Sequence, residues 1–123
     1  MDIKILQDFK SNLISFFDEL IEQFPNESQF ILTRIIIKDQ VSPDFIMNYF
    51  ISSVLPCKEM IKSRDEKFFT DLNVIYFGLA ENAASFKNLW LQNKLDSDDK
   101  VVMWKWMDLF INLAEKYKKL QGH

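Results

Sequence analysis

This chain has only one cysteine, one histidine, two glycines and three prolines among its 123 residues. A single cysteine, Cys57, cannot form an internal disulfide, so the sequence does not indicate an oxidising compartment. The scarcity of glycine and proline leaves few turns, which disfavours a fold of many short strands. The one histidine, His123, is the last residue, so Ser-His-Asp and Cys-His catalysis lack a base and a Cys/His zinc site lacks ligands. The sequence therefore predicts a protein that is not an enzyme and uses no cofactor or metal.

Excess charge and long apolar runs are also missing. The net charge is −3 at pH 7, which gives no general attraction to nucleic acid or to anionic lipid. The longest apolar run, residues 30–37, is interrupted by Arg34 and is far shorter than the roughly 18 residues that a membrane span needs. The first residues alternate charged and apolar side chains and offer no signal-peptide core. We therefore expect a cytoplasmic protein with no membrane span.

Apolar residues are abundant, and their spacing predicts helices. Hydrophobic residues make up 48% of the chain, and a chain of this length typically forms one domain. In residues 5–24 they recur every three or four positions, as on the buried face of a helix. The two adjacent rows are Leu6, Phe9, Leu13, Phe16 and Leu20, and Ile14, Phe17, Ile21 and Phe24. The sequence therefore predicts an all-α fold, a compact single-domain bundle of five or six helices over residues 1–123.

Capping residues and prolines mark the boundaries of the next helices. Asn26, with Gln29 three positions later, resembles a capping box and predicts a helix over residues 27–38. Ser42 is followed by a proline and an aspartate, which together form a strong helix start. Pro56 is predicted to kink the third helix rather than end it, because the residues after it keep helical propensity.

Residues 65–78 are the least regular part of the sequence. Asp65 is suited to cap a short helix. Residues 74–77 are a β-prone run that has no partner strand elsewhere, so we interpret them as a buried connector. Residues 79–92 are predicted to form a helix, followed by a turn.

The last helix is predicted to start with Asp96 or Ser97 as its cap. Acidic residues occupy its first turn and lysines its last turn, which complements the helix dipole at both ends. Its predicted core row has apolar residues spaced by three and four positions: Met103, Trp106, Phe110, Leu113, Tyr117 and Leu120.

Trp104 lies outside this predicted core row. It is two positions from Trp106, about 200° around a helix, so the two indoles cannot face the same narrow stripe. A large aromatic side chain outside the core row is a candidate interface anchor, with Val101 and Met107 on the same flank. The alternative is that the last helix is central and buries both of its sides.

Lys58, Lys62, Arg64 and Lys67 form the densest basic cluster, and Lys58 and Lys62 share a helical face. Such a cluster is a candidate contact for the phosphate groups of a nucleic acid. Three acidic residues interleave with it and dilute its charge, so an ordinary solvated surface is the alternative.

Four segments of the chain carry a resemblance to a known family. Their sequences are LPCK at 55–58, SRDEKFF at 63–69, FKNLW at 86–90 and VMWKW at 102–106. Their order resembles that in a set of helical proteins encoded by giant viruses, the nucleocytoplasmic large DNA viruses, and the match covers residues 45–120. The chain departs from this pattern at Cys57, which replaces an aromatic residue, and at residues 70–85, a longer connector. The resemblance implies a viral origin and a helical module, and it transfers no activity, cofactor or catalytic residue.

From these features we expect a non-enzymatic helical protein-interaction or structural module, with a protein partner or a second copy of itself. In a virus, it would be a virion component or a factor acting on host proteins, in the host cytoplasm or the virion. A nucleic-acid-associated accessory protein is the alternative. A small enzyme or a small-molecule binder with a pocket between helices is the third hypothesis.

Overall fold

The structure is a computed structural model, and it describes residues 2–70 and 95–121. Within these two ranges every regular element is a helix, and no strand occurs. The elements in chain order are α1 (Asp2–Gln23), α2 (Ser28–Asp39), α3 (Pro43–Ser53), the 3-10 turn η1 (Leu55–Cys57), α4 (Lys58–Lys62), α5 (Lys67–Thr70) and α7 (Ser97–Leu120). The predicted all-α bundle is confirmed. The predictions for residues 74–77 and 79–92 lie outside the described residues.

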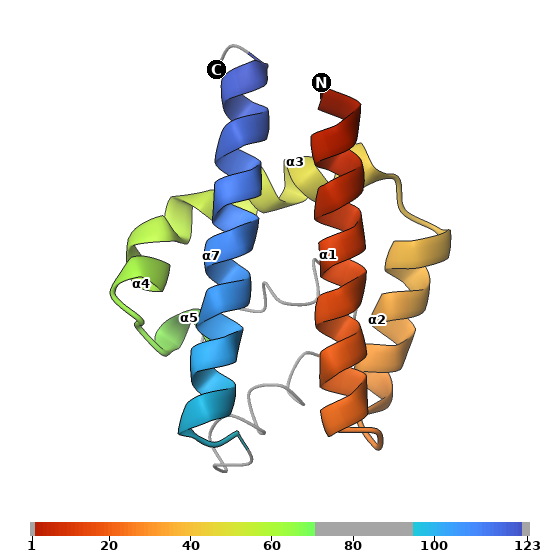
Figure 1. Cartoon of the computed structure of the whole chain (residues 1–123), viewed down its shortest axis with the longest axis vertical. Coiled ribbons are helices and arrows are strands. Elements are labelled where there is room, and N and C mark those ends of the chain that lie inside the picture. Colours follow the sequence, from red (N-terminus) through yellow and green to blue (C-terminus); the bar gives the residue numbers. More distant parts are fainter. Residues whose placement is uncertain (1, 71–94, 122–123) are drawn as a thin grey trace.

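The two longest helices, α1 and α7, run antiparallel through the middle of the molecule (Figure 1). α3 crosses both of them near the N-terminal end of α1 and the C-terminal end of α7. α2 flanks α1 on one side of the bundle, and α4 and α5 flank α7 on the other side. In the described part of the chain, α2 is therefore an edge helix, whereas α7 has neighbours on both sides.

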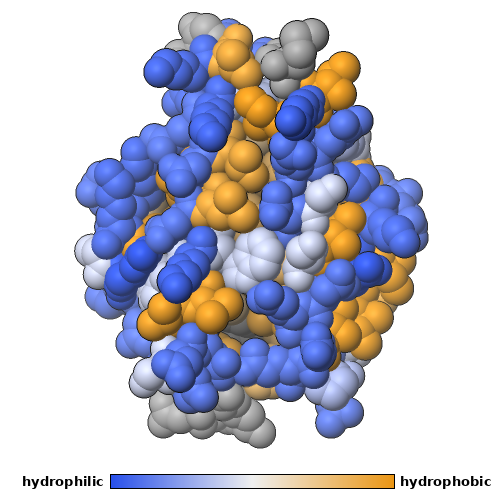
Figure 2. Space-filling view, viewed as in Figure 1, coloured by the Kyte–Doolittle hydropathy of each residue, from blue (hydrophilic) through white to orange (hydrophobic). Residues whose placement is uncertain are grey.

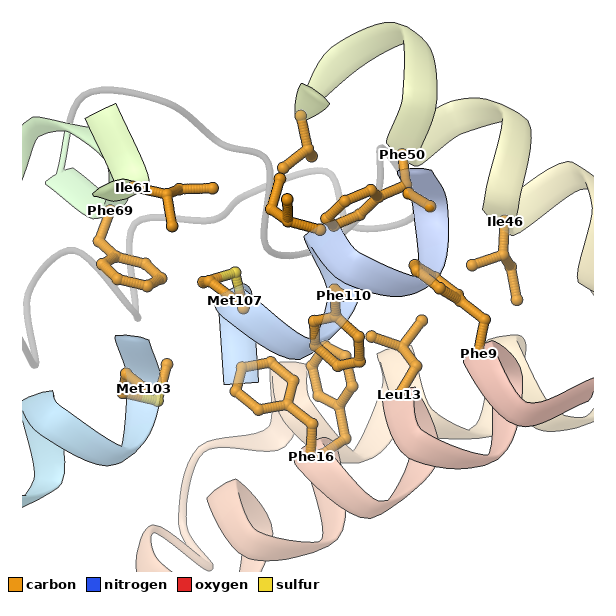
Figure 3. Packing of buried hydrophobic residues seen from close by; sticks show 14 of the residues in the cluster. Phe9, Leu13, Phe16, Ile46, Phe50, Ile61, Phe69, Met103, Met107 and Phe110 are labelled. Carbon is orange, nitrogen blue, oxygen red and sulfur yellow. The ribbon is translucent and has the colours of Figure 1, made fainter. Parts of the chain in front are cut away.

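The core is centred on phenylalanine rings from α1, α3 and α7 (Figure 3). The ring of Phe110 lies 5.3 Å from that of Phe9, 5.8 Å from Phe16 and 6.1 Å from Phe50, measured between centroids. Two of these three pairs, Phe110 with Phe16 and with Phe50, meet edge to face, an arrangement that the aromatic quadrupole favours. The predicted apolar stripe of the first helix faces the core, but it is not fully buried. α1 buries Phe9, Leu13, Phe16, Phe17 and Leu20, and the other predicted members, Leu6, Ile14, Ile21 and Phe24, are half-buried against them.

Two predicted helix starts have the expected capping geometry. The Ser42 hydroxyl accepts a hydrogen bond from the Phe45 amide at 3.3 Å. Asp96 and Asp99 form a reciprocal capping box, in which each carboxylate accepts a hydrogen bond from the other residue's amide, at 2.8 and 3.1 Å. The short helix predicted after Asp65 is also present as α5, and the Asp65 carboxylate accepts from the amide at position 67 at 3.1 Å.

The capping box predicted at Asn26 is wrong. α2 begins at Ser28, its N-cap is Glu27, and no side chain caps it. The reason lies in the turn after α1, where the Glu27 amide donates to the carbonyl of Phe24 at 3.1 Å. This turn places Asn26 one residue too early to reach the free amides of the helix, because an N-cap side chain serves the second or third helical residue.

Pro56 does more than kink its helix. α3 ends at Ser53, and the chain passes through η1 before α4 begins at Lys58. A proline has no amide hydrogen to donate to the preceding turn, and the chain tightens so that the Cys57 amide donates to the carbonyl of Val54, three residues back, at 2.8 Å. The predicted continuation of helical structure is present, but as a separate short helix.

The predicted core row of the last helix is only partly correct. Met103 and Phe110 are buried, Trp106, Leu113 and Tyr117 are half-buried, and Leu120 is exposed. The buried residues of α7 are instead Met103, Trp104, Met107, Phe110, Ile111 and Ala114. The buried stripe is rotated and widened because α7 contacts α1 on one side and α4 on the other.

Candidate functional site

The candidate interface at Trp104 is not an exposed surface. Trp104 retains 6% of its accessible surface and Met107 retains 5%, whereas Val101 is half exposed. The prediction that Trp104 is an exposed anchor is therefore wrong for the isolated chain, and the alternative, in which the helix buries both sides, describes α7. Trp104 is buried because the α4–α5 segment packs against its side of α7, which apolar spacing within α7 alone does not reveal.

Trp104 is enclosed by aromatic and cationic neighbours. Its ring lies 4.7 Å from Phe69 and 6.3 Å from Phe68, between centroids. The Arg64 guanidinium lies over the indole, 5.6 Å from its centroid, within the range of a cation–π interaction. Trp106 instead lies at the edge of the core, and its indole Nε1 donates a hydrogen bond to the Glu19 carboxylate at 2.8 Å.

The basic cluster is held against carboxylates of α7. The Arg64 guanidinium donates to both carboxylate oxygens of Asp108, at 2.9 and 2.8 Å, and Lys58 forms an ion pair with Glu115. These hydrogen bonds raise the pKa of both cations above their ordinary values, while desolvation opposes the rise. Lys62 and Lys67 are exposed on the same segment. Two of the four predicted phosphate contacts are thus neutralised by partners on α7.

A third ion pair joins Lys100 of α7 to Glu66 at 3.1 Å, so three ion pairs follow one another along α7. The three ion pairs join residue 58 to 115, residue 64 to 108 and residue 66 to 100, so the α4–α5 segment lies antiparallel to α7. The charges of residues 58–66 therefore attach the α4–α5 segment to the last helix. This role accounts for Lys58, Arg64 and Glu66 without a nucleic-acid ligand.

We expect Arg64→Ala to lower the free energy of unfolding by about 1 kcal/mol, because a half-exposed bidentate ion pair and a cation–π contact are lost together. Arg64 also has a positive φ of 57°, so alanine keeps the backbone strain that glycine relieves. Arg64→Gly is the matched comparison and should be more stable than Arg64→Ala. Urea unfolding of both variants measures the difference in their free energies of unfolding. If Arg64→Gly loses more of this free energy than Arg64→Ala, the backbone at residue 64 is not strained.

An open cleft of about 440 Å³ lies between the end of α1 and the start of α7. Glu19, Glu22 and Asp99 are among the residues that line it. Glu19 accepts the Trp106 hydrogen bond, and Asp99 belongs to the cap of α7. In the two described ranges, no group of three His, Cys, Asp or Glu side chains is placed to hold a metal ion. Glu19 and Asp99 thus serve packing and capping, and we assign no reaction to this cleft.

Among the described residues, α2 carries three large apolar side chains that are exposed. Ile31, Leu32 and Ile35 are 38, 52 and 43% exposed, and we call these three side chains the α2 face. Figure 2 shows apolar side chains along the edge of the molecule where α2 lies. Beyond the end of the helix, the surface continues into a hollow lined by residues that include Ile36 and Phe45, and Phe45 is 51% exposed.

The α2 face points outward because the opposite side of α2 packs against α1. Phe30, Thr33 and Ile37 are buried, and α2 makes most of its contacts with α1. Arg34, the charge within the apolar run, forms an ion pair with Asp18 of α1. A helix that is apolar all round is normally buried on all sides. Among the described residues, however, α2 packs on one side, against α1, and its second apolar face is exposed.

Sequence reasoning did not identify the α2 face. The signal was present in residues 30–37, whose apolar side chains are too numerous for one buried stripe. Deciding which of them are exposed requires the position of α2 at the edge of the bundle.

No family model, no curated protein and no solved structure matches this chain. Among the described residues, no helix is both long and apolar enough to cross a membrane. The function of the chain is therefore inferred from its own residues.

Proposed function

We propose that this protein is a non-enzymatic helical module that acts by binding another protein chain through the α2 face. The observation that carries the proposal is the exposure of three large aliphatic side chains on an edge helix whose other side is already packed. Contiguous exposed apolar surface on a small domain is typical of interaction sites. Covering it would recover about 25 cal/mol for each Å² of apolar area removed from water.

The α2 face fits a helix of a protein partner. Its apolar residues recur at the three- and four-residue spacing with which two helices interdigitate. A nucleic acid would need several unpaired cations. Of the two basic residues of α2, Arg34 is already paired with Asp18, which leaves Lys38 alone. The ion pairs of Lys58 and Arg64 weaken the nucleic-acid alternative in the same way.

The biological setting that we propose rests on the sequence resemblance. In that setting the chain is a viral protein of the host cytoplasm or the virion, where it serves as a virion component or contacts host proteins. An interaction module without catalytic residues suits either role, because both require binding and neither requires chemistry.

The proposal is tested by placing a photoactivatable cross-linking amino acid at residue 35 of the full chain, in cells that express it. We expect a discrete cross-linked species, because a partner on the α2 face would lie against this position. The matched control carries the same group at Lys105, an exposed polar position on α7. The species should also be lost when Ile31→Glu is added. Equal cross-linking from both positions, or none from residue 35, would overturn the proposed function.

A further inference from the structure

We infer that the partner of the α2 face is a second copy of this chain, packed with the two α2 helices antiparallel. This inference rests on the proposed function and specifies its partner. The resulting contact would be isologous, so that each copy presents the same surface and the assembly closes as a dimer.

The first argument is the pattern of exposed residues along α2. Ser28, Leu32, Ile35 and Asp39 are all exposed and are spaced by four, three and four positions, so they form one seam along the helix. The seam is apolar in its middle and polar at both ends. In an antiparallel pair, the apolar middles meet, and Ser28 of each copy lies beside Asp39 of the other.

The second argument is the charge at the two ends of α2. Its N-cap residue is Glu27, whose side chain makes no capping hydrogen bond, and its first turn holds no acidic residue, whereas Asp39 is the last residue of the helix. A carboxylate stabilises the positive N-terminal end of a helix and is unfavourable at the negative C-terminal end. Antiparallel packing places Asp39 beside the uncapped N-terminus of the other copy. Parallel packing would instead place the two Asp39 carboxylates side by side.

The remaining charges of α2 are compatible with this arrangement. The antiparallel register brings both Lys38 and Asp39 of one copy toward Glu27, the N-cap residue of the other, so the lysine offsets the repulsion between the two carboxylates. Arg34 is engaged with Asp18 of its own chain, so no unpaired guanidinium enters the contact. Charge complementarity therefore favours a second copy over an unrelated apolar helix, which would have to supply the same arrangement.

The contact area is small, so we expect the dimer to be weak. α2 has 12 residues, or about 18 Å of helix. Two such helices bury less than the roughly 1,200–2,000 Å² of a stable interface, so we expect a dissociation constant on the order of 10–100 µM.

Sedimentation equilibrium of the full chain, from about 1 to 500 µM, measures this association. Ile35→Glu should weaken it at least about a hundred-fold, because two isoleucines lose their burial and two carboxylates enter the contact. Asp39→Asn should weaken it about three- to thirty-fold, since each copy loses one charge–dipole interaction. Asp8→Asn, the same change at an exposed position of α1, is the control and should leave it unchanged. Circular dichroism of each variant verifies that the monomer remains folded, and Leu32→Ser replaces any variant that does not.

Orientation is tested by disulfide trapping in a Cys57→Ser background. Chains carrying Ser28→Cys are mixed with chains carrying Asp39→Cys and oxidised at high concentration. The antiparallel pair predicts the mixed 28–39 disulfide, because these positions approach to within the roughly 7 Å that a disulfide can bridge between Cα atoms. Homodisulfides in place of the mixed species would overturn the antiparallel arrangement.

The outcomes separate this inference from the proposed function. A chain that stays monomeric at all concentrations, or a dimer that Ile35→Glu does not weaken, overturns the self-association. If residue 35 then cross-links specifically to a different protein, the proposed function stands and the second copy is excluded. If residue 35 gives no specific cross-link, both are overturned.

Discussion

Phe110→Ala is expected to lower the free energy of unfolding by about 3–5 kcal/mol. Phe110 is fully buried and is the ring that connects α1, α3 and α7, with Phe9, Phe16 and Phe50 around it. Alanine removes the whole ring and leaves a cavity that three helices cannot all close. Because a domain of this size is stabilised by only about 5–15 kcal/mol, this loss is a large share of the total.

Urea unfolding, followed by circular dichroism, measures the effect. Phe45→Ala is the matched control, since it deletes the same side chain from a half-exposed position. It should cost no more than about 1 kcal/mol at concentrations where the chain is monomeric. A loss below about 1 kcal/mol for Phe110→Ala would mean that the packing of α7 on α1 is wrong. If Phe110→Ala does not fold, Phe110→Leu leaves a smaller cavity and provides the measurement.

Trp104→Ala is expected to be nearly as destabilising, at about 3–5 kcal/mol. Trp104 is buried in contact with Phe69 and the Arg64 guanidinium, so its deletion opens a cavity where the α4–α5 segment meets α7. Trp106→Ala is the matched comparison within the same helix. Trp106 is only half-buried, and we expect a smaller loss of about 1–3 kcal/mol, which includes its hydrogen bond to Glu19.

The order of these two effects is the informative quantity. The sequence pattern, with Trp106 in the core row and Trp104 outside it, predicts the opposite order. A near-neutral Trp104→Ala together with a severe Trp106→Ala would show that α7 is rotated relative to the structure. It would also restore Trp104 as a candidate interface anchor.

The α2 face is a different candidate interface from the one that the sequence predicts. Sequence reasoning predicts a protein partner or self-association but places the contact at Trp104, Val101 and Met107. Of these three, Val101 is exposed, and it lies next to the exposed Val102 at the start of α7. The α2 face offers three larger aliphatic side chains on one short helix, which is a better basis for a specific contact.

Much of the secondary structure could be predicted from the sequence because its causes are local. The start of α3 at Ser42 and the start of α7 at Asp96 depend on a side chain and an amide three residues apart. The buried stripe of α1 follows from apolar spacing within one helix. The cap of α2 was misplaced by one residue because a turn hydrogen bond at Glu27, which no propensity reveals, set where the helix begins.

The sequence by itself determined that the chain is helical, where α3 and α7 start and which face of α1 is buried, because each depends on residues within a few positions of one another. The tertiary structure decided what depends on neighbours distant in sequence. Trp104 is buried because the α4–α5 segment covers it. The α2 face is exposed because, within residues 2–70 and 95–121, α2 packs against α1 on its other side. Lys58 and Arg64 are paired because Glu115 and Asp108, 57 and 44 residues away, lie opposite them. Periodicity and composition do not encode which element becomes the neighbour of which.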